Sequence, residues 1–159
     1  MSAEVDVQLA CNDDDVPQPD TIAAWVSNSV EAAGRSGSLE VSVRIVGVDE
    51  IRALNRDFRS KDEPTNVLSF PAGSVAGLPD GLPVALGDVV VCAPVVRREA
   101  GEQGKAVRAH WAHVLVHGTL HLLGYDHVDE REAVEMEALE TRILAAWGMP
   151  DPYGAPGHN

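Results

Sequence analysis

Cysteine, aromatic residues and long apolar runs are all scarce in this sequence. Its two cysteines, Cys11 and Cys92, lie in apolar segments with strand-like patterning, so we expect buried reduced thiols and not a disulfide or a metal site. No apolar run reaches the length of about 18 residues that a membrane-spanning helix needs. The first residues are acidic and lack the basic region of a secretory signal peptide. We therefore expect a cytoplasmic protein with no membrane partner.

Basic residues are scarce as well, with 12 Lys and Arg against 25 Asp and Glu and a net charge of −13. This balance disfavours a general nucleic-acid-binding surface, because phosphate contacts need cations. The acidic excess is concentrated in residues 1–20 and 126–159, whereas residues 35–61 hold six basic residues against four acidic ones. The sequence therefore allows a local positive face on an otherwise acidic molecule.

The hydrophobic periodicity predicts four strands and five helices. We expect strands at 4–11, 39–46, 66–71 and 86–92, and helices at about 21–33, from Asp49 onward, 94–103, 106–123 and 129–147. This order indicates the α+β class, with an approximately four-stranded mixed sheet and helices packed mainly on one face. We expect a single domain over residues 1–147 and a disordered tail over 148–159.

The sequence also predicts helix caps, a loop and the inward-facing positions of two helices. Asp20 and Asp49 are predicted N-caps of their helices. The Gly- and Pro-rich segment 72–85 is predicted to be a mobile loop beside the functional site. Inward-facing positions are predicted in the helix after Asp49 and in the last helix, namely Ile51, Leu54, Phe58, Val134, Leu139, Ile143 and Trp147.

The segment from His117 to His127 contains three histidines at a spacing typical of metal ligands. In a helix, His117 and His121 are about one turn apart and share a face, so both imidazoles can reach one ion. Gly124 is suited to end that helix in a left-handed conformation, which allows His127 to supply a third nitrogen. Three histidines leave a fourth tetrahedral position for water, as in catalytic zinc sites. The spacing therefore predicts a metal held by these three histidines.

The same spacing, H-x-x-x-H-x-x-G-x-x-H, is that of the metzincin metallopeptidases, with one difference. Those enzymes carry Glu directly after the first histidine as the general base, and this chain has Gly118 there. Glycine has no side chain that could accept a proton or orient water. Ordinary metallopeptidase chemistry is therefore disfavoured.

Other polar residues near this string have less specific interpretations. His110 and His113 share the helical face of the ligand pair, which suits either contacts to the ligands or a surface position. Asp126 could orient a ligand histidine or cap the loop. Tyr125 is interpreted as a packing residue, and His158, in the predicted tail, is given no role.

The string HGTLHLLGYDH over residues 117–127 resembles the signature of the YbeY family of bacterial rRNA maturation factors, described as zinc-dependent, single-strand-specific endoribonucleases. Three blocks upstream match family-like positions in the same order: Asn55–Arg59, Thr65–Pro71 and Leu86–Asp88. The resemblance covers about residues 39–143. One departure is Asn66, where the family usually has Asp, so a role of that carboxylate does not carry over.

The resemblance implies a zincin-like fold with its metal site on a helix near the C-terminus, and one Zn²⁺ per chain. It also implies a catalytic role for Arg59 beside His117, because the guanidinium fork suits a phosphate or its transition state. The implied partners are single-stranded rRNA, the small ribosomal subunit and ribosomal proteins, with no DNA expected. Asp88 and Asn66 are interpreted mainly as strand-end hydrogen-bonding residues, and Ser69 as a residue that satisfies the backbone.

Three functions remain in competition. The first is an endoribonuclease that matures rRNA, including the 3′ end of the small-subunit rRNA, and acts in ribosome quality control; either water or the ribose 2′-OH could attack. The second is a ribosome-assembly factor whose zinc is mainly structural and whose acidic surface meets basic ribosomal proteins. The third is a metallopeptidase with an unrecognised base, which Gly118 disfavours.

Overall fold

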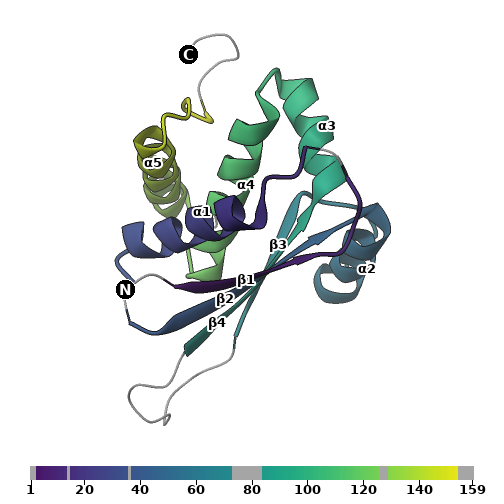
Figure 1. The fold of residues 1–159 in the computed structure, drawn as a ribbon, viewed down its shortest axis with the longest axis horizontal. Helices are drawn as coiled ribbons and strands as arrows, with labels where there is room; N and C mark the ends of the chain where they lie inside the picture. Colours follow the sequence, from purple (N-terminus) through teal and green to yellow (C-terminus); the bar gives the residue numbers. More distant parts are fainter. Residues whose placement is uncertain (1–2, 14, 36, 73–83, 126–128, 154–159) are drawn as a thin grey trace.

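The chain forms one mixed sheet with helices on both of its faces (Figure 1). The computed structural model describes residues 3–13, 15–35, 37–72, 84–125 and 129–153. Within these ranges the elements follow in the order β1 (Glu4–Leu9), α1 (Pro19–Ala32), β2 (Leu39–Val46), α2 (Val48–Arg59), β3 (Val67–Pro71), β4 (Val84–Cys92), α3 (Ala93–Gln103), α4 (Val107–Leu122) and α5 (Glu130–Ala146).

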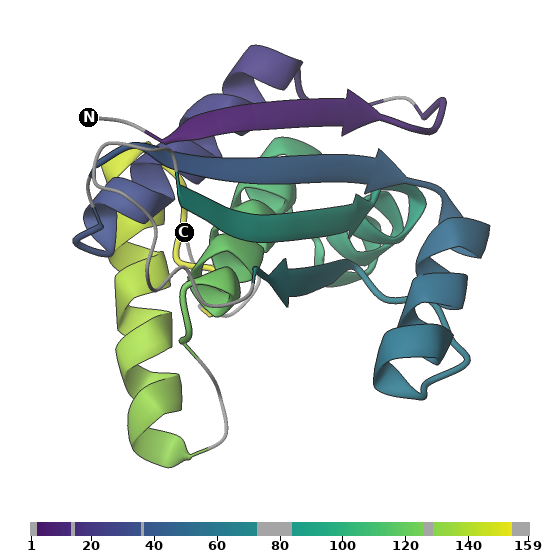
Figure 2. The ribbon, with the colours of Figure 1, turned by 90° about the horizontal axis from the view of Figure 1, so that it is seen from below.

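The sheet has the strand order β1-β2-β4-β3. The pairs β1–β2 and β2–β4 are parallel, whereas β3 runs antiparallel to β4, with Ser69 opposite Val89. Figure 2 shows the arrow of β3 pointing against those of the other three strands. The predicted α+β class and four-stranded mixed sheet are therefore confirmed.

Alternating side chains divide between the two faces of the sheet, as strand geometry requires. Val43 and Ile45 of β2 and Val89 of β4 face the main core, which α1, α4 and α5 complete. Val90 and Leu68 point to the other face, where they pack with residues of α2 in a smaller cluster. Figure 1 shows α1, α3, α4 and α5 on one side of the sheet, so the prediction that helices pack mainly on one face is confirmed.

Helix α4 runs through the middle of this layer. It contacts α1, α3, α5, β3 and β4. Trp111, Leu115 and Leu120 are almost completely buried, and a helix that is apolar around most of its circumference is expected to be enclosed by other elements. The predicted metal-bearing helix therefore occupies a central, enclosed position in the fold.

Two predicted helix starts were wrong. Helix α1 begins at Pro19, after an N-cap at Gln18, and α2 begins at Val48, after an N-cap at Gly47, with no side-chain cap in either case. Asp20 and Asp49 lie in the first helical turns instead. There they still favour the helix, because negative charge interacts well with the N-terminal end of the helix dipole.

Two predicted core residues were also wrong. Phe58 is 67% exposed and Val134 is 62% exposed. Phe58 lies in the last turn of α2, where it packs edge to face with Phe70 of β3, with ring centroids 5.3 Å apart. Helical periodicity gives the direction of a side chain but not how far the neighbouring element extends beneath it.

The ends of the predicted loop and tail can be placed in part. Strand β4 already begins at Val84, and residues 73–83 lie outside the described residues. Of the tail, residues 148–153 contact the rest of the protein: Lys105 donates a hydrogen bond to the carbonyl of Pro152, and Met149 packs against the main core. Residues 154–159, including His158, are outside the described ranges.

Both cysteines are free thiols, with Cys92 buried and Cys11 partly buried. Burial raises the pKa of each thiol. Among the described helices, none is long and apolar enough to cross a membrane.

Candidate active site

A pocket of about 270 Å³ lies between α2, β3 and α4. Arg59 from the end of α2 and His117 and His121 from α4 line it together. Asn66 and Ser69, before and within β3, line it as well. The structure thus brings together residues that are far apart in the sequence, whereas the roles assigned to them remain predictions.

Four histidines form a row along one face of α4. The ring centroids of His110 and His113, and of His113 and His117, are 6.2 Å apart, and those of His117 and His121 are 5.0 Å apart. His117 and His121 are the two that line the pocket. Two imidazoles from successive turns at this separation suit coordination of one zinc ion. The third predicted ligand, His127, lies outside the described residues, as does Asp126.

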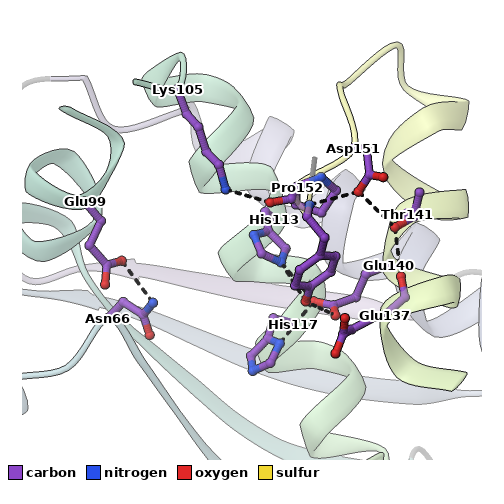
Figure 3. Close-up of polar contacts among 11 residues, drawn as sticks. Asn66, Glu99, Lys105, His113, His117, Glu137, Glu140, Thr141, Asp151 and Pro152 are labelled. Carbon is purple, nitrogen blue, oxygen red and sulfur yellow. Dashed lines mark hydrogen bonds and ion pairs between the residues drawn. The ribbon is translucent and has the colours of Figure 1, made fainter. Parts of the chain in front are cut away.

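A buried carboxylate, Glu140 of α5, contacts this row from behind (Figure 3). His117 Nδ1 lies 3.0 Å and His113 Nε2 lies 3.1 Å from Glu140 Oε2, and the Tyr153 hydroxyl donates to Glu140 Oε1 at 2.5 Å. Burial alone would raise the pKa of Glu140, but hydrogen bonds from His113, His117 and Tyr153 outweigh it and lower this pKa to about 2.

Hydrophobic spacing did not identify Glu140. Acidic residues of an amphipathic helix are normally expected on its outer face, yet Glu140 is completely buried. A signal was present in the pattern, because Glu140 is four residues after Met136 and three before Ile143, both buried. An acidic residue on the apolar face of a helix indicates a buried partner.

His113, His117 and Glu140 together could hold a metal ion, because one ligand atom from each lies within 4.8 Å of the other two. This set shares His117 with the set predicted from the sequence. The burial of His113 lowers its pKa, which favours the neutral imidazole. His113 is partly buried and His110 is buried, so neither is a surface histidine.

A second carboxylate, Glu99 of α3, contacts the same helix from the other side. The Asn66 amide donates a hydrogen bond to Glu99 Oε1 at 3.0 Å, and His110 Nε2 lies 3.0 Å from the same oxygen. Burial raises the pKa of Glu99, but the hydrogen bonds from His110 and Asn66 outweigh it, so this pKa is below its usual value. Asn66 therefore makes a strand-end hydrogen bond, as expected, while also lining the pocket.

Arg59 differs from the other arginines of α2. Arg52 pairs with Asp62 and Arg56 with Asp57, whereas no ion pair of Arg59 occurs within the part of the chain that the structure describes. A guanidinium that is not already engaged by a carboxylate can bind an added anion more readily. Arg59 is therefore suited to contact a phosphate in the pocket.

Gly118 faces strands β3 and β4 of the sheet. A Cβ atom built on it would lie 2.8 Å from Val67 Cγ2 and 3.0 Å from Val89 Cγ1, closer than carbon atoms pack. The carbonyl of Gly118 accepts a hydrogen bond of 2.7 Å from the Ser69 hydroxyl. At the position that carries the general base in metzincins, α4 therefore packs directly against the sheet.

Three further candidates, Ser69, Tyr125 and Asp88, have contacts that account for them without a catalytic role. Ser69 is engaged with the backbone, as predicted. Tyr125 packs against the main core, also as predicted. Asp88 lines a different groove, on the face of the sheet that carries α2.

Comparisons with known proteins agree with the motifs. A family model described as Endoribonuclease YbeY matches residues 8–148. Endoribonuclease YbeY of Halorhodospira halophila is 61% identical over 137 residues, which cover 86% of this chain and 88% of that protein. Endoribonuclease YbeY of Alcanivorax borkumensis is 51% identical over 150 residues, which cover 94% of this chain and 85% of that protein.

A solved structure supports the fold. The solution structure of TM1509 from Thermotoga maritima aligns with 98% of this chain and 99% of its own, with a TM-score of 0.56. At 24% sequence identity this likeness concerns the fold alone.

Proposed function

The chain belongs to the YbeY endoribonuclease family, and from this premise we propose that it cleaves single-stranded rRNA with one zinc ion bound by His117, His121 and His127. The observation that carries the proposal is the pocket that Arg59, His117 and His121 line together. An anion-binding side chain in one pocket with candidate metal ligands suits phosphodiester cleavage.

The donor set fits zinc, because neutral imidazoles are ligands that this ion prefers. When bound, zinc would supply Lewis acidity, which lowers the pKa of water and withdraws electron density from a phosphoryl oxygen. The residues of the chain position the substrate. Arg59 binds a non-bridging phosphate oxygen through its guanidinium N–H groups and offsets the negative charge that grows there during cleavage.

The pocket also limits the substrate. Its volume of about 270 Å³ lies just below the range of about 300–1,000 Å³ typical of small-molecule sites. This space suits one phosphodiester with an adjoining sugar or base. An intact base-paired duplex is too wide to enter a pocket of this size, which accords with a preference for single strands.

The experiment that tests this proposal measures zinc per chain and cleavage of a single-stranded rRNA fragment, before and after chelation. We expect about one zinc per chain, with cleavage lost on chelation and restored by added zinc. The ends of the products separate the two possible nucleophiles, since a 2′,3′-cyclic phosphate identifies the ribose 2′-OH and a 5′-phosphate identifies water.

Variants locate the activity in the pocket. We expect Arg59→Ala to lower the cleavage rate by roughly 10²–10³-fold, as loss of a charged transition-state contact does, while circular dichroism shows an unchanged fold. Arg56→Ala is the matched control, because Arg56 lies on the same helix but pairs with Asp57. Full cleavage by a folded, metal-free His117→Ala variant would overturn the proposal.

In the cell we propose that this activity matures rRNA, including the 3′ end of the small-subunit rRNA, and removes defective ribosomes in the cytoplasm. The support is family membership alone. Sequencing of 16S rRNA 3′ ends in cells that carry only the Arg59→Ala protein tests it, with extended 3′ ends expected.

One observation favours a second candidate function. With a net charge of −13, most of the surface suits basic ribosomal proteins better than naked RNA. In this alternative the chain is an assembly factor of the small subunit whose zinc is mainly structural. Binding to the subunit that survives zinc removal, together with no RNA cleavage at any zinc content, would favour it.

A further inference from the structure

Glu140 lies behind the pocket and not in it. It is completely buried, and it is not among the described residues that line the pocket with Arg59. Its carboxylate reaches the Nδ1 side of the His117 imidazole from α5, and Figure 3 shows Glu140 and His117 pointing toward each other. Glu140 is therefore placed to act on the site through His117.

The contact selects one nitrogen of His117. Glu140 meets Nδ1, at 3.0 Å, and an ionised carboxylate can only accept a hydrogen bond. Nδ1 must therefore carry the proton. Because a neutral imidazole has only one N–H, its lone pair is then on Nε2, the nitrogen on the far side of the ring.

The carboxylate itself is held in place. Tyr153 donates to Oε1, and His113 occupies Oε2 beside His117. Tyr153 belongs to the segment after α5, which Lys105 also holds through the carbonyl of Pro152. Three contacts on one fully buried carboxylate leave it little freedom to rotate.

We propose that Glu140 is a positioning residue that fixes His117 with its Nε2 lone pair available to the metal, and that Tyr153 holds Glu140 in that orientation. The proposal rests on the proposed function in so far as it takes His117 to be a metal ligand. Carboxylates that orient ligand histidines in this way commonly contribute about 10–100-fold to metal affinity.

The test measures zinc affinity by competition with a chromophoric chelator, on the full chain at neutral pH. We expect Glu140→Gln to bind zinc about 10–100-fold more weakly, and Tyr153→Phe to show a smaller loss in the same direction. Glu99→Gln is the matched control, since Glu99 is a partly buried carboxylate that contacts His110 of the same helix. Its zinc affinity should equal that of the wild type.

A second readout follows the histidine directly. Long-range ¹⁵N–¹H NMR of the zinc-free protein reports which nitrogen of His117 carries the proton. We expect protonation at Nδ1 in the wild type and in Glu99→Gln, and a mixture of Nδ1 and Nε2 in Glu140→Gln. An unchanged zinc affinity and an unchanged proton position in Glu140→Gln would overturn the proposal.

Other outcomes separate this proposal from the proposed function. If Glu140→Gln and His113→Ala each abolish zinc binding outright while His121→Ala retains it, Glu140 is itself a ligand, and the positioning role is wrong. If zinc binding weakens as expected but the wild type cuts no RNA, the positioning role stands and the endoribonuclease proposal fails. If the wild type cuts RNA and Glu140→Gln binds zinc normally, only the positioning role fails.

Discussion

Two carboxylates contact α4 from opposite sides, one of them partly buried and the other completely buried. Glu99 of α3 keeps a quarter of its side chain exposed and has two partners, His110 and Asn66. Glu140 of α5 is completely buried and has three partners, two of them histidines of α4. The same pairing of carboxylate and imidazole therefore occurs once at a solvent-accessible position and once in the interior.

The two carboxylates connect α4 to different parts of the fold. Glu99 links α4 to Asn66 and so to the wall of the pocket formed at the start of β3. Glu140 links α4 to the segment after α5. It contacts His117, which also lines the pocket. We expect loss of Glu140 to lower stability more than loss of Glu99, because water cannot take the place of a fully buried carboxylate as hydrogen-bond acceptor.

The largest expected effect is on stability. Glu140→Ala should lower the free energy of unfolding by about 3–5 kcal/mol, because it leaves buried donors without an acceptor. Glu99→Ala should lower it by about 1–3 kcal/mol. Urea unfolding of both variants at pH 7 with chelator present measures the difference, and equal losses would contradict the comparison.

The next largest effect is on the free energy of unfolding at acidic pH. The pKa of Glu140 is lowered to about 2 from an ordinary value of 4.5, so its ionised form stabilises the folded protein above about pH 4.5, and that stability is lost as the pH falls toward 2. The shift corresponds to about 3 kcal/mol. The stability gap between the wild type and Glu140→Gln should narrow over this range, as pH-dependent urea unfolding would show. The corresponding gap for Glu99→Gln should be smaller, and a larger one would reverse the comparison.

A third prediction places a second negative charge beside Glu99. In Asn66→Asp, the amide that donates to Glu99 at 3.0 Å becomes a carboxylate, and two like charges at this distance repel. We expect the pKa of Glu99 to rise and the free energy of unfolding at pH 7 to fall by about 1–3 kcal/mol. Asn66→Ala is the control without the added charge. A loss in Asn66→Asp no greater than that in Asn66→Ala would show that repulsion is unimportant there.

The smallest expected effect is that of Tyr153→Phe, which removes one donor to Glu140 from a residue that is itself exposed. We expect a loss of about 1 kcal/mol in the free energy of unfolding. The double variant Tyr153→Phe with Glu140→Gln should lose less than the sum of the two single losses, since the residues interact. Additive losses would mean that the tyrosine does not act through Glu140.

The sequence predicted the regular elements well where hydrophobic spacing alone determines them. The bounds of β2 were predicted without error, since four inward residues alternate through it. The bounds of α4 were predicted to within one residue at each end. Phe58 and Val134 failed because the spacing of a helix does not reveal where the opposing surface stops.

The candidate site was predictable only where its residues are close in sequence or match a known motif. His117 and His121 follow from helical geometry, and Arg59 was selected by family resemblance. Glu140 was missed because charged residues in a polar-looking helix are normally exposed. Its burial depends on the contact between α4 and α5, which local sequence patterns do not encode.

The close approach of α4 to the sheet at Gly118 has an evolutionary consequence. A glutamate at this position would complete the metallopeptidase motif H-E-x-x-H-x-x-G-x-x-H. Its Cβ alone would collide with Val67 and Val89, and such overpacking typically costs about 1–3 kcal/mol. The helix would have to move away from the strands before the new side chain could be useful. The spacing between α4 and the sheet therefore opposes the gain of a metallopeptidase general base at this position.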